Sequence, residues 1–182
     1  MKTKESSAVP DLLIRIKKNK DGSASLSCVR HDGSTTWQRQ DGKLGAFFPP
    51  HDLTHYAVEN TLGYSNAFYG LIADGWELAD FGVPVGERRR PIPREAGEVE
   101  VFVGVLDLER RLLQRFSTAE FNDQARFAAD RQGSNGFVPR ELTDDELARV
   151  RAARAEVFAR WAAVEPGSAL ELSFARGVPA SD

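Results

Sequence analysis

The chain has 182 residues, with 24 basic against 27 acidic side chains, a formal net charge of −3, three histidines and one cysteine. A lone cysteine excludes a disulfide scaffold and fits a reducing compartment, so we expect a cytoplasmic protein. Apolar runs are too short to cross a membrane, three tryptophans and eleven phenylalanines exclude wholesale disorder, and the mildly acidic balance disfavours a nucleic-acid partner.

The length is typical of a single domain. We place this domain at residues 11–175, with flexible tails at 1–10 and 176–182. Neither an internal repeat nor a low-complexity tract is present, and the glycine- and proline-rich stretch 82–97 is the one candidate break.

Three strand-like segments open the domain. Apolar and polar residues alternate through Leu12–Lys17 and Ser23–Cys28, and Thr35–Arg39 continues the series. Turn signals at Asn19–Gly22 and His31–Ser34 separate them. These features predict an antiparallel meander with one apolar face, which other elements must cover.

Two helices are expected next. Pro49 and Pro50 are predicted to end an extended segment and to open a helix over His51–Leu62, which stops at Gly63. A second, shorter helix fits Asn66–Asp74.

Three longer helices and a last strand complete the domain. Val99–Leu113 also alternates like a strand at its start, but helix is favoured because the helical spacing continues to its end. Ser117–Glu120 and Thr143–Glu146 have capping-box spacing, and the second box opens a helix running to about residue 164. Leu170–Phe174 alternates as the final strand.

This order of elements indicates the α+β class. We expect an antiparallel β-meander, built from the three N-terminal strands plus the C-terminal strand. About five helices are expected to cover one of its faces.

The segment Pro50–Glu59 carries the main chemical signal. On a helix, His51 and His55 lie one turn apart and can bind one metal ion, as the two histidines of H-E-x-x-H helices do. Asp52 takes the place of that motif's glutamate, so it is a candidate general base or a residue that orients a ligand.

A zinc site needs at least three protein ligands. His31 belongs to a hairpin turn, so we expect the third ligand to be a carboxylate. Glu59 is the nearest candidate, as a ligand, as a catalytic carboxylate in the cleft or as a partner of His55. The next candidates are Asp74, Glu77 and Asp80. The expected site is therefore His51, His55 and Glu59 around zinc or another divalent metal.

The same segment, followed by Leu62-Gly63 and Phe68-Tyr69-Gly70, resembles small bacterial proteins of unknown function. They share a P-H-D-L-x-H-[YF]-x-V-E segment, an L-G pair and a short F-[WY]-G helix. The resemblance implies no particular activity, but it indicates that this segment is the functional part. The H-D-x-x-H spacing is also similar to the start of the zinc motif in a ubiquinone-biosynthesis family. That motif has a glutamate where this chain has Ala67, so its function is not carried over.

A basic run at Arg88, Arg89 and Arg90 is a candidate anion-binding site. The planar guanidinium group of arginine can donate two parallel hydrogen bonds to one phosphate or carboxylate group.

Three functions follow as hypotheses. The first is a metal-dependent, hydrolase-like protein. The second is a non-catalytic interaction or regulatory module, or a homo-oligomer, that uses amphipathic helices such as 143–164. The third is metal-free acid–base catalysis by His55 with Asp52 or Glu59.

Overall fold

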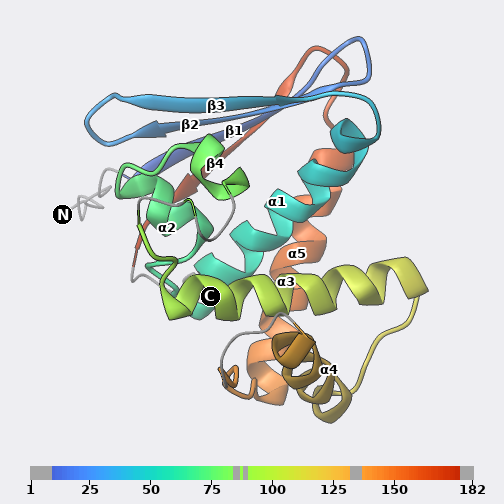
Figure 1. The fold of residues 1–182 in the computed structure, drawn as a ribbon. Helices are drawn as coiled ribbons and strands as arrows, with labels where there is room; N and C mark the ends of the chain where they lie inside the picture. The colour runs from blue at the N-terminus through green and yellow to red at the C-terminus, as the bar shows by residue number, and fades with distance from the viewer. Residues whose placement is uncertain (1–9, 84–86, 88–89, 132–136, 177–182) are drawn as a thin grey trace, which may run out of the picture.

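Four antiparallel strands form one sheet in the order β3-β2-β1-β4 (Figure 1). The computed structural model describes residues 10–83, 87, 90–131 and 137–176. The strands are β1 (Leu12–Lys18), β2 (Ala24–Arg30), β3 (Thr35–Gln40) and β4 (Ala169–Phe174). The predicted meander, and the return of the last strand beside the first, are confirmed.

Alternation in the strands sets the inner face of the sheet. Leu12, Ile14 and Ile16 of β1 are at most 1 % exposed, and Cys28 of β2 is fully buried among them. On β4, Leu172 lies opposite Ile14 and shares this face. The sheet therefore offers one apolar face to the helices.

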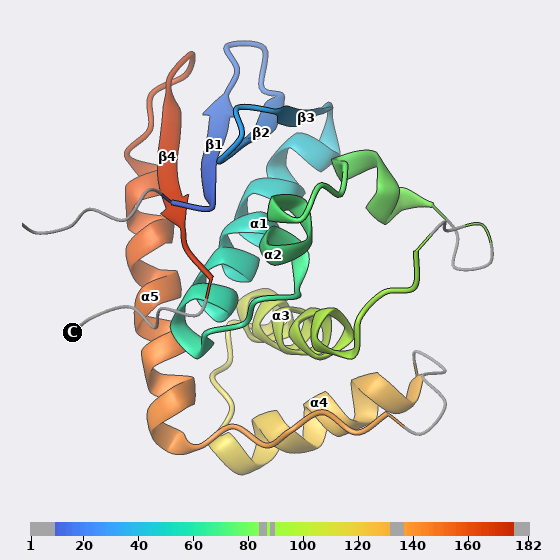
Figure 2. The ribbon, with the colours of Figure 1, turned by 90° about the vertical axis from the view of Figure 1, so that its left-hand side faces the viewer.

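Five α-helices and one 3₁₀-helix lie within the described residues, and the helices cover that single face (Figures 1 and 2). Figure 2 shows α1, α2 and α5 beneath the sheet, α3 below α1, and α4 outermost. Their bounds are α1 (Lys43–Leu62), α2 (Phe68–Ala73), η1 (Leu78–Gly82), α3 (Arg94–Leu112), α4 (Thr118–Arg131) and α5 (Asp144–Ala162). The α+β class is thus confirmed, as is the helix at 99–113.

The start of α1 differs from the prediction. The helix begins at Lys43, so Pro49 and Pro50 lie inside it instead of opening it. Each of these prolines has a φ that fits the helix, but each also removes one N–H donor and crowds the carbonyl four residues before it. The turn before the two prolines packs closely on the sheet. A Cβ on Gly45 would lie 2.8 Å from the Gln40 carbonyl oxygen, so glycine permits this approach.

The apolar stripe of α5 packs against other elements of the same chain. Leu147 and Val150 join the core between α1, α3 and α4, while Val157 joins the core beneath the sheet. Thr143 and Glu146 form the predicted capping box. This stripe, which motivated the interaction-module hypothesis, is therefore covered by the protein itself.

Gly70 of α2 is a position where the fold requires a glycine. A Cβ there would overlap the backbone carbonyl of Ser65. We expect Gly70→Ala to lower the free energy of unfolding by about 3 kcal/mol, because the backbone must shift to relieve the overlap. Urea unfolding measures this loss. The matched control is Gly104→Ala on α3, where a Cβ meets open space and alanine adds up to about 1 kcal/mol. Equal stabilities of the two variants would contradict this account.

Candidate metal centre

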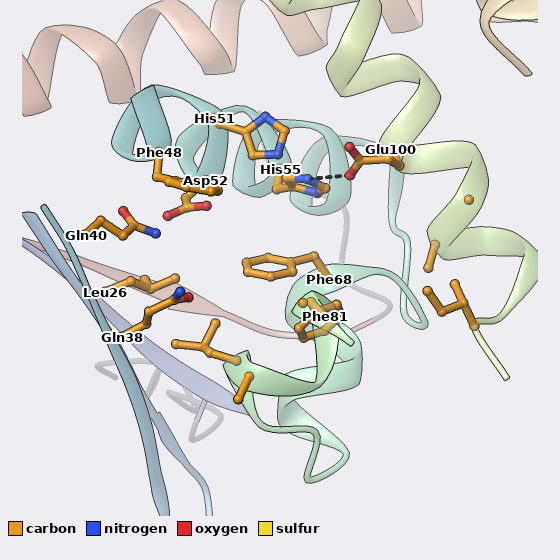
Figure 3. Close-up of a pocket in the computed structure, with 16 residues that line it drawn as sticks. Leu26, Gln38, Gln40, Phe48, His51, Asp52, His55, Phe68, Phe81 and Glu100 are labelled. Atoms are coloured by element: carbon orange, nitrogen blue, oxygen red, sulfur yellow. Dashed lines mark ion pairs between the residues drawn. The ribbon is translucent and has the colours of Figure 1, made fainter. Parts of the chain in front are cut away.

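His51 and His55 project from α1 toward α3 and a cavity under the sheet (Figure 3). Their ring centroids are 4.9 Å apart, as expected for histidines one helical turn apart. The His51 ring stacks on Phe47, with centroids 5.4 Å apart, and the His55 ring lies 5.0 Å from the ring of Phe68. These contacts hold both imidazoles in place.

Glu100 of α3 is the third member of the cluster. Its Oε2 lies 3.1 Å from Nε2 of His55, and one ligand atom from each of the three residues lies within 4.8 Å of the others. Sequence reasoning missed this residue. The signal that could have found it is a carboxylate inside the apolar run Val99–Val103, which is otherwise buried along α3.

Both histidines turn their other nitrogen toward a carboxylate. Nδ1 of His51 lies 3.1 Å from Oδ2 of Asp107, and Nδ1 of His55 lies 3.4 Å from Oε1 of Glu59. Arg154 contacts the other oxygen of Asp107 at 3.2 Å. The contact between His51 and Asp107 is a hydrogen bond, whereas the contact between His55 and Glu59 is an ion-pair distance without one. Carboxylates so placed can orient an imidazole and leave its Nε2 available to a metal.

Glu59 is fully buried and connects α1 to α2. Its Oε2 accepts hydrogen bonds from the backbone N–H groups of Tyr69 at 2.9 Å and Gly70 at 3.4 Å, in the first turn of α2. It therefore lies behind His55 and outside the cluster of ligand atoms. The cluster of possible ligand atoms contains Glu100 and not Glu59, while the expected pairing of Glu59 with His55 is present as a contact of 3.4 Å.

The other carboxylates proposed as third ligands lie elsewhere. Asp74 pairs with Arg176, Glu77 pairs with Arg30, and Asp80 accepts a hydrogen bond from the backbone of Glu77. His31 is exposed in the turn between β2 and β3.

The separations suit one small divalent ion. Two ligands bound tetrahedrally to zinc at about 2.0–2.2 Å lie about 3.3 Å apart, close to the 3.1 Å between His55 and Glu100. Drawing in a ligand at the 4.8 Å limit requires a movement of roughly 1.5 Å. The Glu100 side chain is half exposed and is paired with His55.

Charge balance in the metal-free cluster favours a protonated His55. Burial opposes protonation, but Glu100 and Glu59 outweigh it and raise the pKa of His55 to about 10. Burial acts against the ionised form of Glu100, yet the pKa of this carboxyl is lowered overall because His55 lies beside it. A cation held between two carboxylates marks the place where a metal ion would find negative ligands.

Asp52 lies on the wall of the cavity, near Gln40 in Figure 3. The residue is 3 % exposed, and its Oδ2 is buried without a hydrogen-bond partner. Burial raises the pKa of this carboxyl to about 7, although His51 and His55 act in the opposite direction. An unpaired carboxyl in such a position is suited to exchanging protons with a molecule in the cavity.

The cavity has a volume of about 560 Å³, a size typical of small-molecule sites. Helices α1, α2 and α3, strands β2 and β3, and η1 contribute its walls. The lining residues are Leu26, Gln38, Gln40, Phe48, His51, Asp52, His55, Phe68, Leu78, Ala79, Phe81, Gly82, Ile92, Ala96, Gly97 and Glu100.

The predicted anion site is only partly described. Arg88 and Arg89 lie outside the described residues. Arg90 is exposed, with its guanidinium 6.0 Å from the centroid of the Trp76 ring. The predicted tails at 1–10 and 176–182 likewise fall almost entirely outside the described residues.

Comparison of the chain with protein-family models, curated proteins and solved structures gave no match. Among the described residues, every helix is too short or too polar to span a membrane.

Proposed function

We propose that this protein is a metal-dependent hydrolase of small molecules. In this proposal His51, His55 and Glu100 hold one zinc ion or a similar divalent ion. The observation that carries it is the convergence of these three ligand atoms, within 4.8 Å of one another, on the wall of a cavity of about 560 Å³.

Two histidines and one carboxylate form a ligand set found in catalytic zinc sites. Zinc bound by three protein ligands keeps one position open, where it polarises a carbonyl group or lowers the pKa of water. The open side of this cluster faces the cavity, because all three residues line it. Structural zinc sites, which have four protein ligands, fit this arrangement less well.

Asp52 is assigned the role of the base. In the hydrolysis, the oxygen of water bonds to a carbonyl carbon of the substrate, and the bond to the leaving oxygen or nitrogen breaks. Asp52 accepts a proton from the water and delivers it to the leaving group. A pKa raised by burial to about 7 suits a group that must both take and give a proton near neutral pH.

Calorimetric titration of the metal-free protein with zinc tests the proposal. We expect about one zinc ion per chain, with release of about one proton at pH 8, because His55 is protonated below its pKa of about 10. Glu100→Ala is expected to weaken zinc binding by at least about 100-fold, since it removes a ligand.

Glu156→Ala is the matched control, because Glu156 is an exposed carboxylate on α5, away from the cavity. Its zinc affinity should equal that of the natural sequence. Absence of zinc binding in the natural sequence would refute the proposal and leave His55 as the protonated centre of a buried ion triad. Equal affinities of the two glutamate variants would refute the assignment of Glu100.

A further inference from the structure

The cavity has a second polar end beside the strands of the sheet, across the cavity from Glu100 (Figure 3). Gln40, the last residue of β3, is only 4 % exposed and lines the cavity. Its side-chain amide makes no hydrogen bond with any of the described residues. An amide that lines a cavity and has no partner within the described residues is available to hydrogen-bond to a molecule bound there.

Apolar and aromatic side chains also line the cavity that Gln40 shares with the histidines. Phe68 and Phe81 stand in contact, with ring centroids 4.8 Å apart, and Phe68 also contacts the ring of His55. Phe48 and Leu26 line the same cavity. Walls of this kind accept a flat or bulky apolar group, because burying its surface is favourable and the rings offer edge and face contacts.

Charge restricts the ligand further. Within the described part of the chain, the residues lining the cavity include the carboxylates Asp52 and Glu100 but neither a lysine nor an arginine. A ligand carrying its own negative charge at the Gln40 end would therefore find no cation there and would lie near Asp52. A neutral group avoids this repulsion.

A glutamine amide offers one acceptor oxygen and two N–H donors. Another carboxamide is its natural complement, since the two groups can exchange a pair of hydrogen bonds. We propose that the cavity takes neutral molecules with a carboxamide-type group at Gln40, an apolar ring-sized middle and the hydrolysable ester or amide at the histidine end. This proposal names the substrate class of the proposed function and rests on it.

Three probes that share one ring test this inference: benzamide, benzoate and benzylamine, which are neutral, anionic and cationic. Each is titrated into the metal-free protein, and binding is followed by ligand-observed NMR. We expect benzamide to bind at least about tenfold more tightly than benzoate, whose charge meets no cation near Gln40. We also expect it to bind more tightly than benzylamine, whose ammonium group only donates and cannot exchange a pair of hydrogen bonds with Gln40. This ranking uses the natural sequence alone. Equal binding of the three probes, or no binding of benzamide, would overturn the proposal.

Gln40→Leu keeps the size of the side chain and removes its amide. We expect benzamide affinity to fall about tenfold in this variant, and to stay unchanged in the matched control Gln114→Leu, where the glutamine is exposed after α3. A Gln40→Leu variant that folds and binds benzamide as before would overturn the assignment.

The zinc titration separates this inference from the proposed function. Zinc binding without benzamide binding would overturn the substrate class alone. Benzamide binding without zinc binding would refute the hydrolase and, with it, the claim that the bound amide marks a substrate.

Discussion

Replacing His51 and His55 together with alanine is expected to abolish zinc binding. Protein purified in the presence of zinc and then dialysed should carry about one zinc ion per chain, and the double variant should carry less than about 0.1. The physical reason is that Glu100 would be the single remaining ligand, and one half-exposed carboxylate does not hold zinc against water. Elemental analysis of both proteins measures the effect.

His31→Ala provides the matched control, because His31 is the one other histidine of the chain and is exposed in the β2–β3 turn. This variant should keep its full zinc content. Far-ultraviolet circular dichroism verifies that the double variant keeps its helices. Loss of zinc in His31→Ala, or retention of zinc in the double variant, would contradict the assignment of the ligands.

Local patterns in the sequence predicted the sheet well. Alternation in β1, β2 and β4 is strict, since one face packs against helices and the other meets water, and this two-residue period survives in the structure. The helix α3 was also predicted. Its first valines alternate as in a strand, but the apolar residues follow helical spacing to the end of the segment. The start of α1 depends on how its first turn packs against the sheet. The prolines suggested a helix start, yet the close approach of Gly45 to the sheet supports an earlier turn.

The candidate site shows the same division between local and long-range information. His51 and His55 are related by helix geometry, so their proximity could be read from their spacing. Glu100 comes near them only because α3 packs across α1, and no local rule in one sequence predicts that contact. Glu59 was a reasonable third ligand by separation along the chain. On a straight helix, however, it lies about 12 Å along the axis from His51, at 1.5 Å per residue.

The placement of Glu59 leads to a second large effect. Glu59→Ala should lower the free energy of unfolding by about 3–5 kcal/mol, measured by urea unfolding of the metal-free protein. The variant leaves the backbone N–H groups of Tyr69 and Gly70 unpaired in the core and removes a buried carboxylate that faces His55.

Glu59→Gln separates support of the histidine from ligation of the metal. The amide oxygen still accepts a hydrogen bond from the first turn of α2, so the loss of stability should be smaller than in Glu59→Ala. The amide has no charge with which to orient and polarise His55, and zinc affinity should fall about 10–100-fold.

Glu100→Ala should show the opposite pattern, with little change in unfolding and near-complete loss of zinc, because its side chain is half exposed and lies at the proposed ligand position. The pair of variants therefore distinguishes the two carboxylates that flank His55. If Glu59→Gln abolished zinc binding as fully as Glu100→Ala, Glu59 would be a direct ligand after all. If Glu59→Ala unfolded as the natural sequence does, its bonds to the first turn of α2 would contribute nothing to the fold.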